Sequence, residues 1–373
     1  MSERKTASST VSMKGGGYYS QHTRGAKDVI DNTAALAIEA LSAIDVARDE
    51  DRRRPFSIAD FGSADGGTSV DLVRKLIAGV RERAPARPIT VTYTDLPRND
   101  FSAIFAMVHG ERPDIRSYLD EFDDVYVFAS GTSFYLPIFA EATLDLGFSA
   151  TAMHWLSALP GPITDHVQAV GARGTELERF RAHAMRDWER ILLHRARELA
   201  PGGRLVMSNF CVDEQGRYLG NTGGVNMFDT FNELWRSMAE RGRITEQEYQ
   251  RTAFPQFYKT VEEYCAPLTD TTSAVYRAGL RLESAETRVV PCPYRAAFEQ
   301  HGDVARFAAE YVPTLRSWSE TVFFNSLDPS RPVEERRAIV DEYYQSYVER
   351  VKRTPDGHAM DYVHVYMVAS KVE

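Results

Sequence analysis

Cysteine is scarce in this chain of 373 residues, which contains three, Cys211, Cys265 and Cys292. An odd number of widely spaced cysteines excludes a disulfide framework and a C-x-x-C metal site. We therefore expect three buried or half-buried thiols.

Long apolar runs and a surplus of positive charge are also lacking. Hydrophobic residues make up 43% of the chain, but no run approaches the roughly 18 consecutive apolar residues of a membrane span. The first ten residues are polar and lack the apolar core of a secretory signal. The formal net charge is −9 and the basic residues are scattered, which argues against nucleic acid as a partner. These absences predict a cytoplasmic protein without a membrane partner.

The most informative segment begins at Ile58. A short apolar run, 58–61, precedes a turn in which Gly62, Gly66 and Gly67 permit positive φ or close backbone approach. Apolar residues then recur at helical spacing from 70 to 80, and a β-branched run, 89–94, ends at Asp95. This βαβ unit predicts a parallel sheet with a ligand at the carboxyl ends of its strands.

The turn favours a cationic ligand over a dinucleotide. Its glycines have the order G-x-x-x-G-G, whereas the dinucleotide fingerprint requires G-x-G-x-x-G. Asp60 and Asp65 would repel a pyrophosphate and attract a cation such as the α-ammonium of S-adenosylmethionine. Asp95 is placed to accept hydrogen bonds from ribose hydroxyls. The alternative is that Asp60 and Asp95 only cap turns.

Seven segments in order resemble the SABATH family, the salicylate, benzoate and theobromine group of S-adenosylmethionine-dependent methyltransferases. They are SMKGGGYYSQHT (12–23), DFGSADGG (60–67), DLPRNDF (95–101), GTSFYLPIF (131–139), AMHWLS (152–157), RARELAPGGRLVMS (195–208) and FPQFYKTVEEY (254–264). The resemblance therefore covers nearly the whole chain.

This resemblance implies an α/β fold, a Rossmann-like class I methyltransferase sheet with helices on both faces and an inserted helical cap. It implies transfer of a methyl group by direct displacement to the carboxylate of a small aromatic or otherwise apolar acid. Such an acid, with a pKa of about 4, is already ionised at pH 7, so no general base is needed. Methylation of a neutral nitrogen or oxygen acceptor, or a non-catalytic small-molecule-binding protein, stays open, as do a homodimer and a role for Mg²⁺, which the mechanism does not require.

The resemblance also implies a cofactor-binding set. Tyr19 and Thr23 would lie over the cofactor, and Asp60 and Gly62 would hold its amino-acid end. The ribose and the adenine would then be contacted by Asp95, Leu96, Ser133 and Phe134.

For the acceptor, the resemblance implies that Trp155 donates its indole N–H to the substrate carboxylate and that His154 lies beside it. These two are the catalytic candidates. The further substrate-binding candidates are Lys14, Ala26, Thr151, Phe210, Met227 and Phe228, and Lys14 has an equally plausible surface or structural role.

Departures from the family pattern concern the acceptor. Ala26 stands where the carboxylate-methylating members have a glutamine, and Thr151 stands where a pocket tyrosine often lies. Leu136 and Pro137 replace a usual glycine and arginine. Fewer aromatic walls suggest a different acid.

The rest of the chain predicts three segments. Residues 1–210 would form the N-terminal substrate and cofactor segment with the cofactor-binding α/β core, including a strand from Thr143 that delivers His154 and Trp155 to the sheet edge. Residues 211–285 would form a mainly helical cap. Residues 286–373 would complete the core, with a second cap segment at about 295–320, a helix over 334–352 and a last strand in an antiparallel pair.

Overall fold

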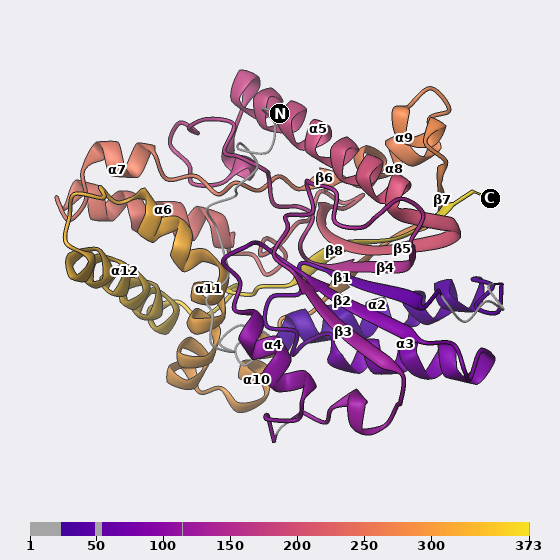
Figure 1. Ribbon diagram of the computed structural model, residues 1–373. Helices are drawn as coiled ribbons and strands as arrows, with labels where there is room; N and C mark the ends of the chain where they lie inside the picture. Colours follow the sequence, from indigo (N-terminus) through magenta and orange to yellow (C-terminus); the bar gives the residue numbers. More distant parts are fainter. Residues whose placement is uncertain (1–23, 49–53, 114, 373) are drawn as a thin grey trace.

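The computed structural model describes residues 24–48, 54–113 and 115–372, with side chains from Lys27 onward. Its central sheet has the strand order β3-β2-β1-β4-β5-β8-β7 (Figure 1). The strands are β1 (Phe56–Phe61), β2 (Ile89–Thr94), β3 (Val125–Ser130), β4 (Leu144–Ala150), β5 (Leu199–Val212), β7 (Leu280–Val290) and β8 (Tyr362–Lys371), and the short β6 (Lys259–Thr260) pairs with β5.

The strands from β3 to β5 pair in parallel, and β8 runs antiparallel between β5 and β7. Every residue of β1 is buried, and so are all but the last of β4, because helices cover both faces of a parallel sheet. The predicted strand over 89–94 and the predicted antiparallel pair at the end of the chain are confirmed.

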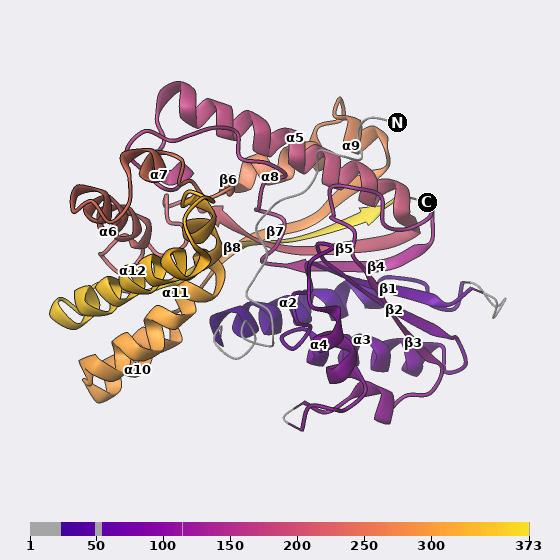
Figure 2. The ribbon, with the colours of Figure 1, turned by 60° about the vertical axis from the view of Figure 1, so that its left-hand side comes forward.

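Helices flank the sheet on both faces, as Figures 1 and 2 show. On one face lie α2 (Arg24–Ser42), α3 (Val70–Arg83) and α4 (Phe101–Val108), with the 3-10 turn η2 (Tyr118–Asp120) nearby. On the other face lie α5 (Gly174–Glu198), α8 (Val261–Thr269) and α9 (Ala274–Arg277). The predicted helix after the glycine turn is α3, whose apolar residues are all turned into the core.

The remaining helices form a cap beside the carboxyl ends of the parallel strands (Figure 1). They are α6 (Met227–Glu240), α7 (Glu246–Gln250), α10 (Pro293–His301), α11 (Val304–Ser326) and α12 (Val333–Arg353), and the loop before α5 contains η3 (Ala169–Gly171). One aromatic cluster spans these cap helices, with Trp235 packed 5.0 Å from Phe323 and 5.1 Å from Tyr343 between ring centroids.

A buried ion pair joins two parts of the cap. Glu248 of α7 is 1% exposed and accepts from Nε of Arg331, in the α11–α12 turn, at 2.7 Å. Burial opposes the charge of this carboxylate, but the hydrogen bonds from Arg331 and from the backbone lower the pKa of Glu248 to about 2. An ion pair as well as aromatic packing therefore stabilises the cap.

Two helices near the cap in sequence belong to the sheet, because α8 and α9 pack against β7, which begins at Leu280. The helix predicted over 334–352 is α12, which packs against α6 and α11 in the cap. Apolar periodicity located these helices but could not say which surface they cover. The division into three segments stays a prediction.

Two smaller expectations concern the cysteines and the glycine turn. Cys211 and Cys292 are buried and Cys265 is half-buried, all as free thiols, as expected. Gly62 and Gly66 of the glycine turn have positive φ. In the described part of the chain, no helix has the length and hydropathy to cross a membrane.

Candidate active site

The glycine turn after β1 leaves no room for a side chain. Gly62 has a φ of +84°, and a Cβ at this position would lie 2.4 Å from Cβ of Ala152, which follows β4. Both observations require glycine, because L side chains avoid this backbone region and cannot approach so closely. The turn thus brings bare backbone to the carboxyl edge of the sheet, next to the segment that carries His154 and Trp155.

Asp60 is the residue before the last of β1, close to this turn. The residue is 3% exposed, and its Oδ2 accepts a hydrogen bond from Ser69 Oγ at 2.6 Å. Burial, with a further contribution from Asp95, raises the pKa of Asp60 to about 7 against the bond from Ser69. A carboxyl group in this state ionises readily when a cation approaches it.

Asp95 ends β2 and faces the same turn. Its Oδ2 accepts from the amide of Ala64 at 2.8 Å and its Oδ1 accepts from the amide of Leu96 at 2.7 Å. Burial raises the pKa of Asp95. Each carboxylate oxygen keeps a lone pair beyond these bonds, so the residue can cap the turn and also accept from a diol.

The segment after β3 closes beside this carboxylate. A Cβ on Gly131 would lie 3.3 Å from Cα of Pro97, so the two loops are in close contact. Ser133 is buried, and the half-buried Phe134 lies 4.8 Å from the ring of Tyr135. The structure therefore brings Leu96, Ser133 and Phe134 to the same edge as Asp60 and Asp95.

Sequence reasoning missed Arg195, which holds this segment in place. Its guanidinium is fully buried and donates to the carbonyl oxygens of Phe134 at 3.3 Å and Leu136 at 3.1 Å. Glu198 on the same helix compensates its charge, with an Nε to Oε2 distance of 2.7 Å. An arginine and a glutamate at i, i+3 give the same pattern on a solvated helix face, so no sequence signal distinguishes this pair.

Trp155 follows β4 and is half-buried. Its backbone pairs with Gln256 in an isolated bridge, and its carbonyl accepts from the hydroxyl of Tyr135. These contacts fix the main chain, while the indole N–H makes no hydrogen bond to any described residue. The donor is therefore available to a ligand.

His154 is buried beside it and is neutral. The ring is 1% exposed and lies 4.7 Å from Phe210 and 5.9 Å from both Trp155 and Tyr258 between ring centroids. Burial, with smaller effects of His364 and Lys259, holds the pKa of His154 well below its usual range. Its Nδ1 has no hydrogen-bond partner among the described residues.

A polar network below these two residues was not predicted. Asp187 of α5 accepts from the amide of Ser157 at 2.7 Å and from its hydroxyl at 2.8 Å, which anchors the end of the AMHWLS segment. Lys259 is 1% exposed, with its Nζ 4.9 Å from the ring centroid of Tyr264, and burial lowers its pKa to about 8. The partners lie far apart in the sequence and carry no local motif.

The other residues predicted to bind the acceptor lie in different parts of the structure. Thr151 directly follows β4. Phe210 lies on β5, and its ring contacts that of His154. Met227 and Phe228 start α6, and the ring of Phe228 packs in the cap core at 6.0 Å from Phe231 and from Phe254. Three predicted residues, Lys14, Tyr19 and Thr23, lie outside the described residues, as does the side chain of Ala26.

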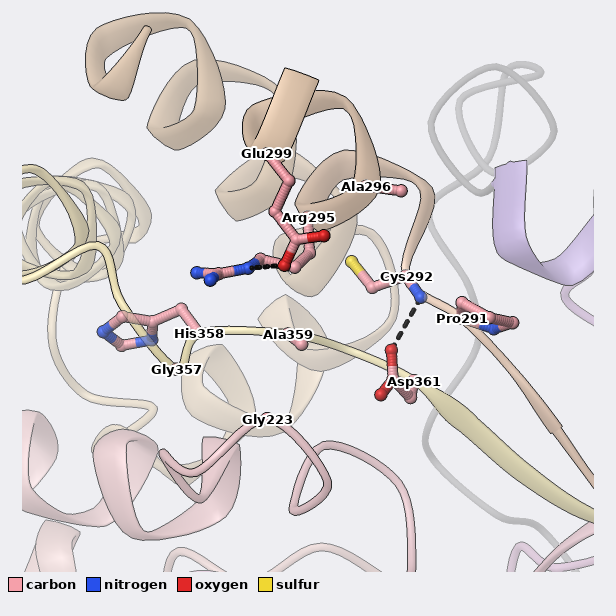
Figure 3. A pocket seen from close by; sticks show the side chains of 10 residues that line it. All are labelled: Gly223, Pro291, Cys292, Arg295, Ala296, Glu299, Gly357, His358, Ala359 and Asp361. Carbon is pink, nitrogen blue, oxygen red and sulfur yellow. Dashed lines mark hydrogen bonds and ion pairs between the residues drawn. The ribbon is translucent and has the colours of Figure 1, made fainter. Parts of the chain in front are cut away.

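A separate cavity of about 250 Å³ lies where α10 meets the segment before β8 (Figure 3). Cys292, Arg295, Glu299 and Asp361 line it, and Asp361 Oδ1 accepts from the amide of Cys292 at 2.7 Å. None of the predicted site residues that the structure describes lines this cavity. Among the described residues, no group of three or more His, Cys, Asp or Glu side chains is placed to hold a metal ion.

Comparison with known proteins decides the family. The family model described as SAM dependent carboxyl methyltransferase matches residues 8–369. The chain belongs to this family. It is a SAM-dependent carboxyl methyltransferase, as the resemblance of its seven segments implied.

Relatives of this carboxyl methyltransferase are known from fungi and plants. The O-methyltransferase acrG of Aspergillus aculeatus is 26% identical over 99% of this chain and 98% of its own length. The loganic acid O-methyltransferase of Catharanthus roseus is 26% identical over 69% of this chain and 72% of its own length. A solved structure, loganic acid methyltransferase with SAH, has a TM-score of 0.75 and 21% identity, and the match covers 97% of this chain and 99% of that one. The predicted class I methyltransferase fold is confirmed.

Proposed function

We propose that this carboxyl methyltransferase esterifies a small acid with a largely apolar body, whose carboxylate is held by Trp155. The indole N–H of Trp155 carries the proposal, because it makes no hydrogen bond to a described residue. Beside it, the rings of His154, Phe210 and Tyr258 form a wall that suits an apolar or aromatic skeleton.

The residues at the other end of the site suit S-adenosylmethionine. The bare backbone at Gly62 admits a close ligand, Asp60 provides a buried carboxyl for an ammonium group, and Asp95 retains acceptor capacity for ribose hydroxyls. When bound, this cofactor supplies a methyl group that its sulfonium makes electrophilic. We assign the adenine contacts to Leu96, Ser133 and Phe134, and we keep Tyr19 and Thr23 as candidates over the cofactor.

The protein then contributes alignment and exclusion of water. Because an acid of pKa about 4 is ionised at pH 7, His154 need not remove a proton, and its depressed pKa keeps it neutral. A neutral imidazole orients a carboxylate by hydrogen bonding without the tight ion pair that a cation would form. Correct alignment of two reactants can lower a barrier by roughly 7 to 11 kcal/mol at best.

Other sequence predictions keep that status. Ala26, Lys14, Met227 and Phe228 remain candidates for the acid's binding surface. A cytoplasmic location, a homodimer and a role for Mg²⁺ are predictions that need measurements of their own.

A direct test is to incubate the protein with labelled S-adenosylmethionine and a panel of aromatic and aliphatic carboxylic acids. Methyl esters detected by mass spectrometry are the expected products. Neutral phenols and N-heterocycles in the same panel serve as the contrast. Methylation of these compounds alone would move the acceptor away from a carboxylate, and binding of S-adenosylmethionine with no turnover on any compound would favour a binding protein.

A further inference from the structure

Thr151 occupies a strained position at the carboxyl end of β4. Its φ is +59°, in the left-handed region that β-branched residues rarely adopt. Its amide donates to the carbonyl of Ser208 on β5 at 2.7 Å, which holds the backbone there. Strain of this kind collects at sites that bind ligands.

The hydroxyl of Thr151 lies within hydrogen-bond distance of a histidine on β8. Oγ1 lies 3.0 Å from Nε2 of His364, which sits on β8 directly opposite Phe210 of β5. His364 is fully buried, and burial lowers its pKa to about 3, so the ring is neutral.

The tautomer of His364 decides the direction of this bond. Nδ1 of His364 has no hydrogen-bond partner among the described residues. When Nε2 is unprotonated, the Thr151 hydroxyl donates its proton to it, and when Nε2 carries the proton, the hydroxyl accepts from it. With either tautomer Oγ1 keeps at least one lone pair that can accept a bond from another donor.

The Thr151 hydroxyl adjoins the aromatic wall beside Trp155, which the rings of His154, Phe210 and Tyr258 form. The ring of Phe210 lies 4.4 Å from His364 and 4.7 Å from His154, so it bridges the two histidines. The other hydroxyl in the wall, that of Tyr258, already donates to Gln256 Oε1 at 3.0 Å. Thr151 therefore presents a half-buried acceptor within an otherwise aromatic surface.

We propose that Thr151, oriented by His364, accepts a hydrogen bond from a hydroxyl on the substrate's skeleton, so that the enzyme prefers hydroxylated acids to their deoxy analogues. The inference rests on the proposed function and narrows its substrate class. A site that bonds a substrate hydroxyl rejects the analogue without it, since the buried polar group then loses its partner. Thr151 acts as a specificity residue, and His364 is a positioning residue.

Matched pairs of acids test the preference. The panel would contain hydroxyphenylacetic acids with phenylacetic acid, hydroxycinnamic acids with cinnamic acid, and hydroxylated medium-chain fatty acids with their parents. We expect at least one hydroxylated member to exceed its partner at least 10-fold in kcat/KM. If no pair differs by more than threefold, the inference is wrong.

Variants locate the preference at Thr151. Thr151→Val keeps the size and β-branching and removes the hydroxyl, so it should lower kcat/KM about 10-fold or more for the hydroxylated acid, chiefly through KM, and lower it far less for the deoxy acid. Thr151→Ser should restore the preference. Thr354→Val is the matched control, because that exposed hydroxyl binds only the carbonyl of Arg350 at 3.1 Å. Equal losses on both acids in Thr151→Val would overturn the assignment.

His364→Phe tests the positioning role and should also reduce the preference for the hydroxylated acid. Melting temperature and affinity for S-adenosylhomocysteine report whether each variant is folded, and if His364→Phe does not fold, the Thr151 series decides alone. Esters formed equally from both members of every pair would defeat this inference only. Intact cofactor binding with no ester from any acid would instead defeat the proposed function.

Discussion

The cofactor half and the acceptor half of this enzyme are assembled over very different sequence distances. In the cofactor half, β1 to β3 with the loops that follow them, Asp60 binds Ser69 nine residues away and Asp95 binds Ala64 thirty-one residues away. In the acceptor half, the segment after β4 with β5, β8 and the cap, Thr151 binds His364 across 213 residues. Local pairs leave contiguous motifs in a sequence, and distant pairs do not.

The two halves also differ in the direction in which the protein shifts the pKa values of their ionisable groups. Asp60 in the cofactor half has a raised pKa, so it is partly protonated at neutral pH without a ligand. The histidines of the acceptor half have lowered pKa values and are neutral there. The cofactor half thus has a carboxyl group that an approaching cation can ionise. In the acceptor half, the histidines carry no charge.

The largest expected effect comes from Asp60→Asn. The folded pKa of Asp60 is about 7 and the usual pKa of an aspartate is 3.8, so the folded state binds more protons between these values and stability falls as pH rises through this window. At pH 8 the variant should gain up to about 4 kcal/mol of unfolding free energy and lose roughly 100-fold in affinity for S-adenosylhomocysteine, since a charged partner is gone. Urea unfolding and calorimetry measure both. Unchanged affinity would remove Asp60 from the ammonium site.

Gly62→Ala comes next and concerns sterics alone. The added Cβ meets Ala152 in a backbone region unsuited to alanine, so we expect a loss of about 2 to 4 kcal/mol in unfolding free energy and weaker cofactor binding. Gly110→Ala is the matched control, because φ is +74° there but no atom lies within 4 Å of the added Cβ. It should cost about 1 kcal/mol. Similar losses in both variants would show that the close approach to Ala152 is unimportant.

The third prediction concerns the acceptor half and the variant Trp155→Phe. It removes the indole N–H and keeps most of the ring, so kcat/KM on the best acid should fall about 10- to 100-fold, as expected for one hydrogen bond to a charged group. Melting temperature and affinity for S-adenosylhomocysteine should stay the same. Trp235→Phe is the control, because that indole donates to Thr252 Oγ1 at 2.8 Å inside the cap. It should lower stability rather than catalysis, and the reverse pattern would place the acceptor elsewhere.

The smallest effect is in the pH dependence of stability. His364 has a folded pKa of about 3 against a usual 6.5, so the unfolded state binds more protons below pH 6.5 and stability falls on acidification. Between pH 7.5 and 5 this group should cost about 2 kcal/mol. In the Asp60→Asn background, which removes the opposing trend, urea unfolding should show this loss, and His364→Phe should reduce it. A pH-independent difference between these two proteins would contradict the assignment.

The sequence predicted the glycine turn after β1 and the carboxylate after β2, because both features come from neighbouring residues. The turn needs glycine at position 62, and Asp95 directly follows β2, so the pattern and the geometry coincide. The sequence did not reveal the roles of Arg195, Lys259 and His364. Those side chains acquire their surroundings only when elements from distant parts of the chain pack together, and a lone histidine in an apolar strand has no pattern of its own.

The pairing of Val290 with Tyr362 closes the β7–β8 ladder at the point where the chain enters and leaves α10, α11 and α12. In engineering terms this segment is an insertion with adjacent ends, the arrangement that most readily tolerates excision or exchange. A tight turn in its place would make β7 and β8 an ordinary hairpin. Helices from a homologous enzyme could be grafted at the same two residues, which would exchange this part of the cap while the cofactor half keeps its own sequence.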